Sequence, residues 1–157
     1  LIINSCINTL GAVSGLYLGQ MLATARARRI FTAVMREAMA VAAAMGLTVE
    51  PGGGGKLDYY RFLKGGGLLD RWRRDITIRA IGHKYRRLKS SSLQSLERGR
   101  PTEIDYLNGY ICQKGGRLGV PTPVNQALVA MVKEVEAGRR KIDPANLADP
   151  GLEPGAV

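Results

Sequence analysis

Cysteine and uninterrupted apolar runs are both scarce in this sequence, and each scarcity excludes a class of protein. Only Cys6 and Cys112 occur among 157 residues, too few for a disulfide framework, and we expect both to be reduced in the cytoplasm. Arg and Asn interrupt the longest apolar stretches, so we expect no membrane span. The chain opens at Leu1 without Met or a signal-peptide pattern, from which we expect a piece of a longer cytoplasmic protein.

Acidic residues are also few, and the net charge is +10. Residues 56–100 contain thirteen Lys and Arg against four Asp and Glu, so this segment supplies +9 of the total. A nucleic-acid surface, a solvated helix face and a surface facing an anionic cofactor or substrate all fit this excess. The absence of interleaved aromatic residues and of a binding motif disfavours nucleic acid. His83, the single histidine, lies among cations without metal-ligand companions, so we expect it at the surface and expect no metal site.

Strand patterns are missing as well, and apolar spacings of three and four residues predict an all-α fold. On the helix expected over 67–80, we place Trp72 and Ile76 on the inner face. The four glycines Gly52–Gly55 predict a flexible loop, because no strand precedes them and no Lys-Ser or Lys-Thr follows as a phosphate loop requires. The domain should span 1–138, and 139–157 should form an extended or frayed tail. About seven helices are expected, over residues 2–15, 19–45, 57–64, 67–80, 90–98, 102–113 and 122–138.

Several polar residues could carry chemistry. Asn4 and Asn8 are four residues apart, so both amides share one helix face, and spacing alone favours structural hydrogen bonds for them. The serines at 90–92 offer a helix cap, and a helix start also suits a carboxylate ligand. Glu103 follows Thr102 in a capping-box pattern that Asp105 completes, and by local rules Glu103 only favours the helix dipole.

Three stretches together carry a family resemblance. They are Ser91-Ser92-Leu93-Gln94, the run Pro101-Thr102-Glu103-Ile104-Asp105-Tyr106-Leu107-Asn108-Gly109, and Gly119-Val120-Pro121-Thr122-Pro123. The chain from Leu1 to about Glu136 resembles the C-terminal domain of ketopantoate reductases (2-dehydropantoate 2-reductases). The resemblance implies a helical bundle like the C-terminal domain of the 6-phosphogluconate dehydrogenase group. It also implies an upstream Rossmann domain that this chain lacks, since no Gly-x-Gly-x-x-Gly follows a strand here.

The resemblance also implies roles for individual residues. The family's proton-donating Lys would stand immediately before Leu1, outside this chain, and Glu103 would lie beside that Lys and the nicotinamide ribose of the cofactor. The implied reaction is hydride transfer from NADPH to a 2-keto acid, with ketopantoate giving pantoate. Asn108 and Gly109 would serve close helix packing. The implied substrate-binding residues are Asn4, Asn8, Ser91, Ser92, Leu93 and Gln94.

Two departures from the family pattern keep alternatives open. Leu18 stands where the family often has Asn, and Ser95 stands where many members have Asp. A reductase or dehydrogenase of the same architecture for another small keto or hydroxy acid is therefore the first alternative. The second is a non-catalytic helical module that dimerises or binds nucleic acid. We expect the isolated chain to be inactive and to form a homodimer, because the missing domain should leave an apolar face exposed.

Overall fold

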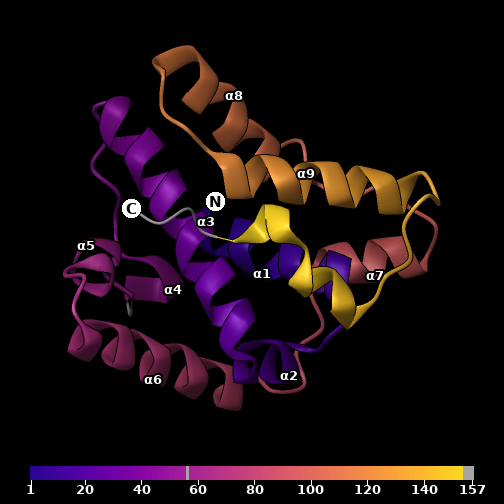
Figure 1. The fold of residues 1–157 in the computed structure, drawn as a ribbon, viewed down its shortest axis with the longest axis horizontal. Helices are drawn as coiled ribbons and strands as arrows, with labels where there is room; N and C mark the ends of the chain where they lie inside the picture. The colour runs from indigo at the N-terminus through magenta and orange to yellow at the C-terminus, as the bar shows by residue number, and fades with distance from the viewer. Residues whose placement is uncertain (56, 154–157) are drawn as a thin grey trace.

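The chain folds as an all-α domain, as its sequence predicts (Figure 1). The structure is a computed structural model that describes residues 1–55 and 57–153. Within these ranges no β-strand forms beyond an isolated bridge between Gly52 and Leu57. No helix in the described part has both the length and the apolar character needed to cross a membrane. The helices are α1 (Ile2–Ser14), α2 (Leu18–Ala23), α3 (Ala25–Ala44), α4 (Gly52–Gly55), α5 (Tyr59–Leu63), α6 (Leu68–Lys84), α7 (Ser91–Glu97), α8 (Asn108–Leu118) and α9 (Pro123–Glu136).

Helix α1 forms the centre of the domain, and α3, α7 and α9 pack around it (Figure 1). Its apolar positions recur every three or four residues, and Cys6, Leu10 and Val13 have no solvent exposure. Burial of a side chain the size of Leu10 contributes about 1.5–3 kcal/mol to folding. The helix ends at Gly15, whose φ of 70° suits a residue without Cβ. Polar side chains on such an enclosed helix need either hydrogen-bonding partners within the protein or access to solvent.

The single helix expected over 19–45 is two helices. The chain turns at Thr24, which has extended backbone angles (φ −79°, ψ 124°) between α2 and α3. Arg28 makes this break possible, because its guanidinium donates to the carbonyl oxygens of Leu22 (3.1 Å) and Ala23 (2.7 Å) at the end of α2. The same guanidinium pairs with Asp75 of α6 at 3.1 Å. A tertiary contact therefore replaces hydrogen bonds that a continuous helix would have made.

The prediction of the inner face of α6 is wrong. Trp72 is 67% exposed and Ile76 is 46% exposed, whereas Arg74, Ile78 and Gly82 are buried. The buried residues are four apart, and Gly82 lets α6 approach α2 so closely that a Cβ would lie 2.8 Å from Leu22. Backbone approach at the glycine, rather than the size of the tryptophan, sets the orientation of this helix.

The helix expected to start at Thr102 starts six residues later, at Asn108. The Thr102 hydroxyl accepts from the Ile104 N–H at 3.2 Å and donates to Glu136 at 2.7 Å. Asp105 does not complete a capping box; its carboxylate pairs with Lys133 of α9. Turns fill the interval, and α8 then continues to Leu118, past the glycines expected to end it near residue 113.

The four glycines also differ from expectation. Gly52–Gly55 form one helical turn, and the backbone of Gly52 exchanges two hydrogen bonds with that of Leu57 (2.8 and 3.0 Å). A Cβ on Gly52 would lie 2.1 Å from the Tyr59 hydroxyl, so the turn packs against α5. The glycine run therefore forms a helical turn that packs against α5.

The tail after residue 138 is not frayed in the described part. Two 3-10 segments form, η1 (Pro144–Ala148) and η2 (Pro150–Leu152), and they bury Leu147 and Leu152 in the core. The Asn146 amide donates to the carbonyl oxygen of Val13 at 2.8 Å, which secures the tail to the end of α1. Residues 139–153 therefore belong to the domain; residues 154–157 of the expected tail lie outside the described residues.

Candidate functional site

A buried polar cluster, which we call the asparagine hub, joins α1, α3, α8 and α9. It consists of Thr9, Glu37, Asn108 and Asn125. The Asn108 oxygen accepts from the Thr9 hydroxyl at 2.5 Å, and its amide donates to the Ser5 carbonyl (3.2 Å) and to Asn125 (2.9 Å). Both asparagines are fully buried, yet every side-chain polar atom has a partner. The packing role expected for Asn108 is confirmed, and hydrogen bonds rather than shape alone perform it.

Glu37 of α3 completes the hub at the first turn of α9. Its carboxylate accepts from the backbone N–H groups of Val124 and Asn125, both at 2.9 Å, and from the Asn125 amide at 2.6 Å. A carboxylate at a helix N-terminus satisfies free N–H groups and opposes the helix dipole. Sequence analysis missed this residue because its partners are 87 and 88 residues away. The available signal was that Glu37 is the sole acid between Ala25 and Ala44.

Asn4 and Asn8 lie on one face of α1, as their spacing predicts. Asn4 is exposed near the start of the helix, whereas Asn8 is only 9% exposed. Neither side-chain amide makes a hydrogen bond with another residue among 1–55 and 57–153, in contrast to the structural hydrogen bonds that spacing alone favoured. Among described side chains, only the Arg28 Nε is fully buried without a partner, so the Asn8 amide keeps some access to solvent. Two amides on one helix face are thus available to an external ligand.

The start of α7 lies beside Asn8. The Ser90 hydroxyl accepts from the Leu93 N–H at 3.2 Å, which confirms a serine cap, and it donates to the Asn8 carbonyl at 3.5 Å. Gly11 allows this approach, because a Cβ there would lie 2.3 Å from the Ser90 hydroxyl. Of the remaining expected substrate residues, Ser91 is exposed, Ser92 and Leu93 are buried, and the Gln94 amide donates to the Lys89 carbonyl at 3.1 Å.

Glu103 is exposed on the turns that precede α8. Its carbonyl accepts from the Tyr106 and Leu107 N–H groups at 3.0 and 3.1 Å, which fixes the backbone there. Its carboxylate makes no hydrogen bond or ion pair with any residue in the described ranges. Asn108, five residues on, bonds to Ser5 and Thr9, so the hub ties the Glu103 segment to α1. No hydrogen bond joins Glu103 to Asn4 or Asn8 in the described part of the chain.

The two departures from the family pattern have different surroundings. Leu18 is almost fully buried at the start of α2, and its N–H donates to the Leu88 carbonyl at 2.9 Å. Ser95 is half-buried on α7. Leu18 therefore serves the core, where an asparagine would need a polar partner.

The same all-α arrangement occurs in a known reductase of solved structure, and a family model matches most of the chain. The chain belongs to the ketopantoate reductase family: the model described as "Ketopantoate reductase PanE/ApbA C terminal" matches residues 1–136. A 2-dehydropantoate 2-reductase from Mesorhizobium japonicum is 30% identical over 136 residues, which are 87% of this chain and 35% of that protein.

Solved structures agree with this assignment. A PanE/ApbA family ketopantoate reductase from Ralstonia eutropha JMP134 superposes with a TM-score of 0.67 and 31% identity, over 88% of this chain and 39% of that one. D-mandelate dehydrogenase, solved with NADH and anilino(oxo)acetate, gives a TM-score of 0.66 at 22% identity, over 88% of this chain and 50% of that one, and shows the fold alone. The chain thus spans well under two thirds of the length of these relatives.

Proposed function

We propose that this chain is the substrate-side domain of an NADPH-dependent 2-keto acid reductase that converts ketopantoate to pantoate. The observation that carries the proposal is the pair of amides on α1, Asn4 and Asn8, which face no protein partner in the described residues although α1 is otherwise enclosed. The Asn8 side chain is nearly buried and its amide has no protein partner in the described residues, so a polar ligand can replace the solvent that reaches it. The family membership supports the same conclusion.

In this proposal each group has a defined task. The amides of Asn4 and Asn8 hold the polar groups of the keto acid, and the exposed Ser91 hydroxyl at the start of α7 binds its carboxylate. Ser92, Leu93 and Gln94 shape that wall from behind, since two are buried and the third bonds to Lys89. Glu103 orients the ammonium group of the Lys expected before Leu1 and stabilises its charged form, which readies it to protonate the ketone oxygen.

NADPH supplies the hydride when it is bound. The described residues contain no strand followed by a glycine fingerprint, so they do not fit a whole dinucleotide, and we assign its binding mainly to an N-terminal Rossmann domain. In this proposal Glu103 reaches only the nicotinamide ribose. The chain by itself should bind NADPH weakly and show no turnover; detectable reduction of ketopantoate by residues 1–157 alone would overturn that expectation.

The test uses a protein in which this chain follows a nucleotide-binding domain, as in its longer relatives. NADPH oxidation is followed with ketopantoate for the unchanged protein, for Glu103→Gln and for Glu50→Gln, an exposed acid elsewhere. We expect Glu103→Gln to lower kcat by about 100-fold or more, because the Lys that donates the proton depends on Glu103 for its position and charge, and positioned proton transfer contributes about that much. Glu50→Gln should leave kcat unchanged. Equal activity of all three proteins would rule out the role of Glu103.

A second candidate is a dehydrogenase for another small 2-keto or 2-hydroxy acid. The observation in its favour is Leu18, which is buried where the family often has a substrate-facing Asn, together with the shared fold of D-mandelate dehydrogenase. A panel of 2-keto acids with branched, aromatic and linear side chains separates the two. A protein that binds NADPH but reduces another acid at least tenfold faster than ketopantoate would favour this candidate.

We also propose that the isolated chain forms a homodimer, and that the native compartment is the cytoplasm, where free thiols such as Cys6 and Cys112 stay reduced. The surface for dimerisation is the exposed apolar stripe of α6 formed by Leu69, Trp72 and Ile76. Helix α6 itself lies at the edge of the domain (Figure 1). Light scattering should give twice the chain mass, and the monomer mass for Trp72→Ser.

A further inference from the structure

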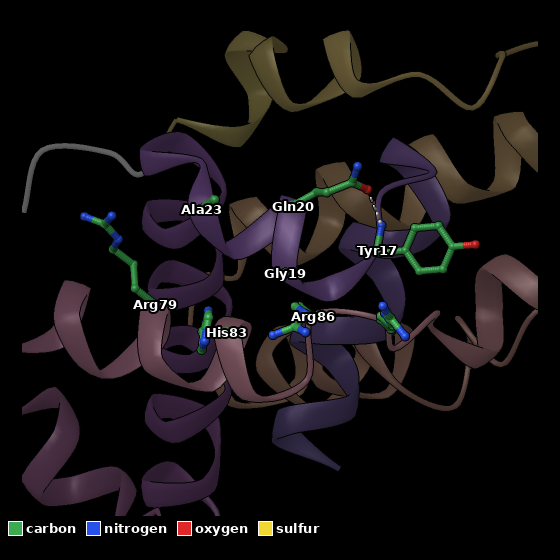
Figure 2. Close-up of a pocket in the computed structure, with 8 residues that line it drawn as sticks. Tyr17, Gly19, Gln20, Ala23, Arg79, His83 and Arg86 are labelled. Atoms are coloured by element: carbon green, nitrogen blue, oxygen red, sulfur yellow. Dashed lines mark hydrogen bonds between the residues drawn. The ribbon is translucent and has the colours of Figure 1, made fainter.

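A basic hollow lies between α2 and α6. Figure 2 shows Arg79, His83 and Arg86 along its α6 side and Tyr17, Gln20 and Ala23 along its α2 side. Its volume is about 850 Å³, enough for a small ligand. None of the expected substrate residues borders it. The lining residues, which define the basic hollow, are Tyr17, Gly19, Gln20, Ala23, Arg79, His83, Arg86 and Arg87.

The positive charge of the basic hollow is not neutralised by the protein. No acidic residue lines it, and the side chains of Arg79, His83, Arg86 and Arg87 make no hydrogen bond or ion pair with any residue that the structure describes. Two cations on neighbouring elements are paired, by contrast: Arg28 with Asp75 at 3.1 Å, and Lys89 with Glu97 at 2.8 Å. Like charges gathered in a concave surface focus the positive potential and attract anions.

A second hollow nearby gives the contrast. It is lined by Tyr60, Arg61, Lys64, Gly65, Asp70 and Arg73. There Arg73 pairs with Asp70 at 3.6 Å and donates to the carbonyl oxygens of Arg61 and Lys64, each at 3.2 Å. Basic residues alone therefore do not distinguish the two surfaces. The second hollow contains Asp70 and one paired guanidinium group, that of Arg73, whereas no acidic residue lines the basic hollow and all three of its guanidinium groups lack a partner in the described part of the protein.

Close backbone contacts hold the walls of the basic hollow in place. A Cβ on Gly19 would lie 2.6 Å from the Cα of Arg86, and a Cβ on Gly82 would lie 2.8 Å from Leu22. The Leu18 N–H donates to the Leu88 carbonyl at 2.9 Å across the same junction. On the α2 side, the Gln20 side-chain oxygen accepts from the Tyr17 N–H at 3.3 Å (Figure 2). A site with fixed walls loses little conformational entropy when a ligand binds.

We propose that the basic hollow binds a small, multiply charged phosphate compound, a diphosphate or a phosphate ester. Arginine favours phosphate because its planar guanidinium donates two parallel hydrogen bonds to phosphate oxygens. Three arginines can neutralise the charge of a diphosphate, and the Tyr17 hydroxyl and Gln20 amide offer further donors. A nucleic-acid strand fits less well, because a run of bases needs successive aromatic platforms and only Tyr17 lines the hollow. This site goes beyond the keto-acid function proposed above.

Inorganic pyrophosphate titrated into the chain is the test, followed through the NMR signals of the His83 imidazole. Because His83 is the single histidine, its signals report on this hollow alone. We expect saturable shifts, with the affinity weakened about tenfold by Arg79→Gln and by Arg86→Gln, since each removes a charge-assisted contact. The matched control is Arg61→Gln, which removes the same charge from the second hollow and should change the affinity less than twofold. Circular dichroism confirms that each variant is folded.

Three outcomes overturn the proposal. They are the absence of saturable His83 shifts, an equal loss of affinity in Arg61→Gln, and tighter binding of a single-stranded oligonucleotide that all three variants weaken alike. The last result would indicate a diffuse nucleic-acid surface. A parallel titration with 2′,5′-ADP identifies the source of the phosphate: preference for it over pyrophosphate supports a nucleotide ligand, and the reverse supports a free diphosphate. Because the readout does not involve keto-acid reduction, failure here leaves the proposed function standing.

Discussion

The asparagine hub and helix α6 differ in whether their polar and charged side chains have partners within the protein. In the hub, Thr9, Asn108, Asn125 and Glu37 satisfy one another in the interior, and each bond joins a different pair of helices. On α6, by contrast, the arginine at 79 has no partner in the described part, and Trp72 is exposed. A buried polar group needs a hydrogen-bonding partner within the fold, whereas a polar group at the surface can be paired by a bound ligand. The hub therefore positions the domain, and α6 is where we propose that partners bind.

The largest loss of stability should come from a substitution on the packed face of α6. Ile78→Ala should lower the free energy of unfolding by about 2–5 kcal/mol, because the fully buried side chain leaves a cavity. At a protein concentration low enough to keep the chain monomeric, Trp72→Ala, six residues earlier and exposed, should change the free energy of unfolding by no more than about 0.5 kcal/mol. Urea unfolding monitored by circular dichroism measures both. A larger loss for Trp72→Ala in the monomer would mean that the tryptophan faces the core after all.

A substitution in the asparagine hub should destabilise the domain almost as strongly. Asn108→Ala removes the partner of the Thr9 hydroxyl, the Ser5 carbonyl and the Asn125 side chain, and leaves them buried. We expect a loss of about 2–4 kcal/mol in the free energy of unfolding, since each unsatisfied group costs about 1–3 kcal/mol. Asn4→Ala is the control on the exposed face of α1 and should be near neutral. Equal unfolding curves for the two variants would show that the hub does not hold the domain together.

A smaller effect is expected where the hub meets α9. Glu37→Ala removes the acceptor for two backbone N–H groups at the helix start, and loss of such a cap costs about 1–2 kcal/mol. Glu50→Ala, an exposed acid outside the hub, provides the comparison and should change little. Hydrogen exchange should show that the amides of Val124 and Asn125 lose protection in Glu37→Ala. Unchanged exchange at these two amides would contradict the capping role.

The smallest expected effect is a pH-dependent contribution of Glu136 to the stability of the domain. Burial alone would raise the pKa of the Glu136 carboxyl, but hydrogen bonds from Thr102 and the charge of Lys133 outweigh it and lower that pKa below its ordinary value. A carboxyl with a lowered pKa in the folded state stabilises the fold above its unfolded pKa of about 4.3, and loses that contribution as the pH falls through its folded pKa. The stability difference between the wild type and Glu136→Gln should therefore shrink below about pH 4.3. A constant difference from pH 7 to pH 3 would refute this linkage.

Part of the site could be predicted from local pattern and part could not. The shared face of Asn4 and Asn8 follows from a spacing of four on a helix, and the Ser90 cap follows from residue type at a helix start. The partners of Glu37 could not be predicted, because residues so distant in the chain meet only through packing. The same limit explains Thr24, where a salt-bridged arginine from the next helix permits a break that helical propensity does not predict.

By itself, the sequence determined the all-α class, the family and the two amides on α1, because helical periodicity and short motifs are local properties. Only the tertiary structure decided which face of α6 is buried, that Leu147 and Leu152 join the core, and that four basic or imidazole side chains share a hollow with α2. The physical reason is that burial and neutralisation depend on what approaches a residue from elsewhere in the chain. At Gly19 and Gly82, the missing Cβ allows the approach that places α6 against α2.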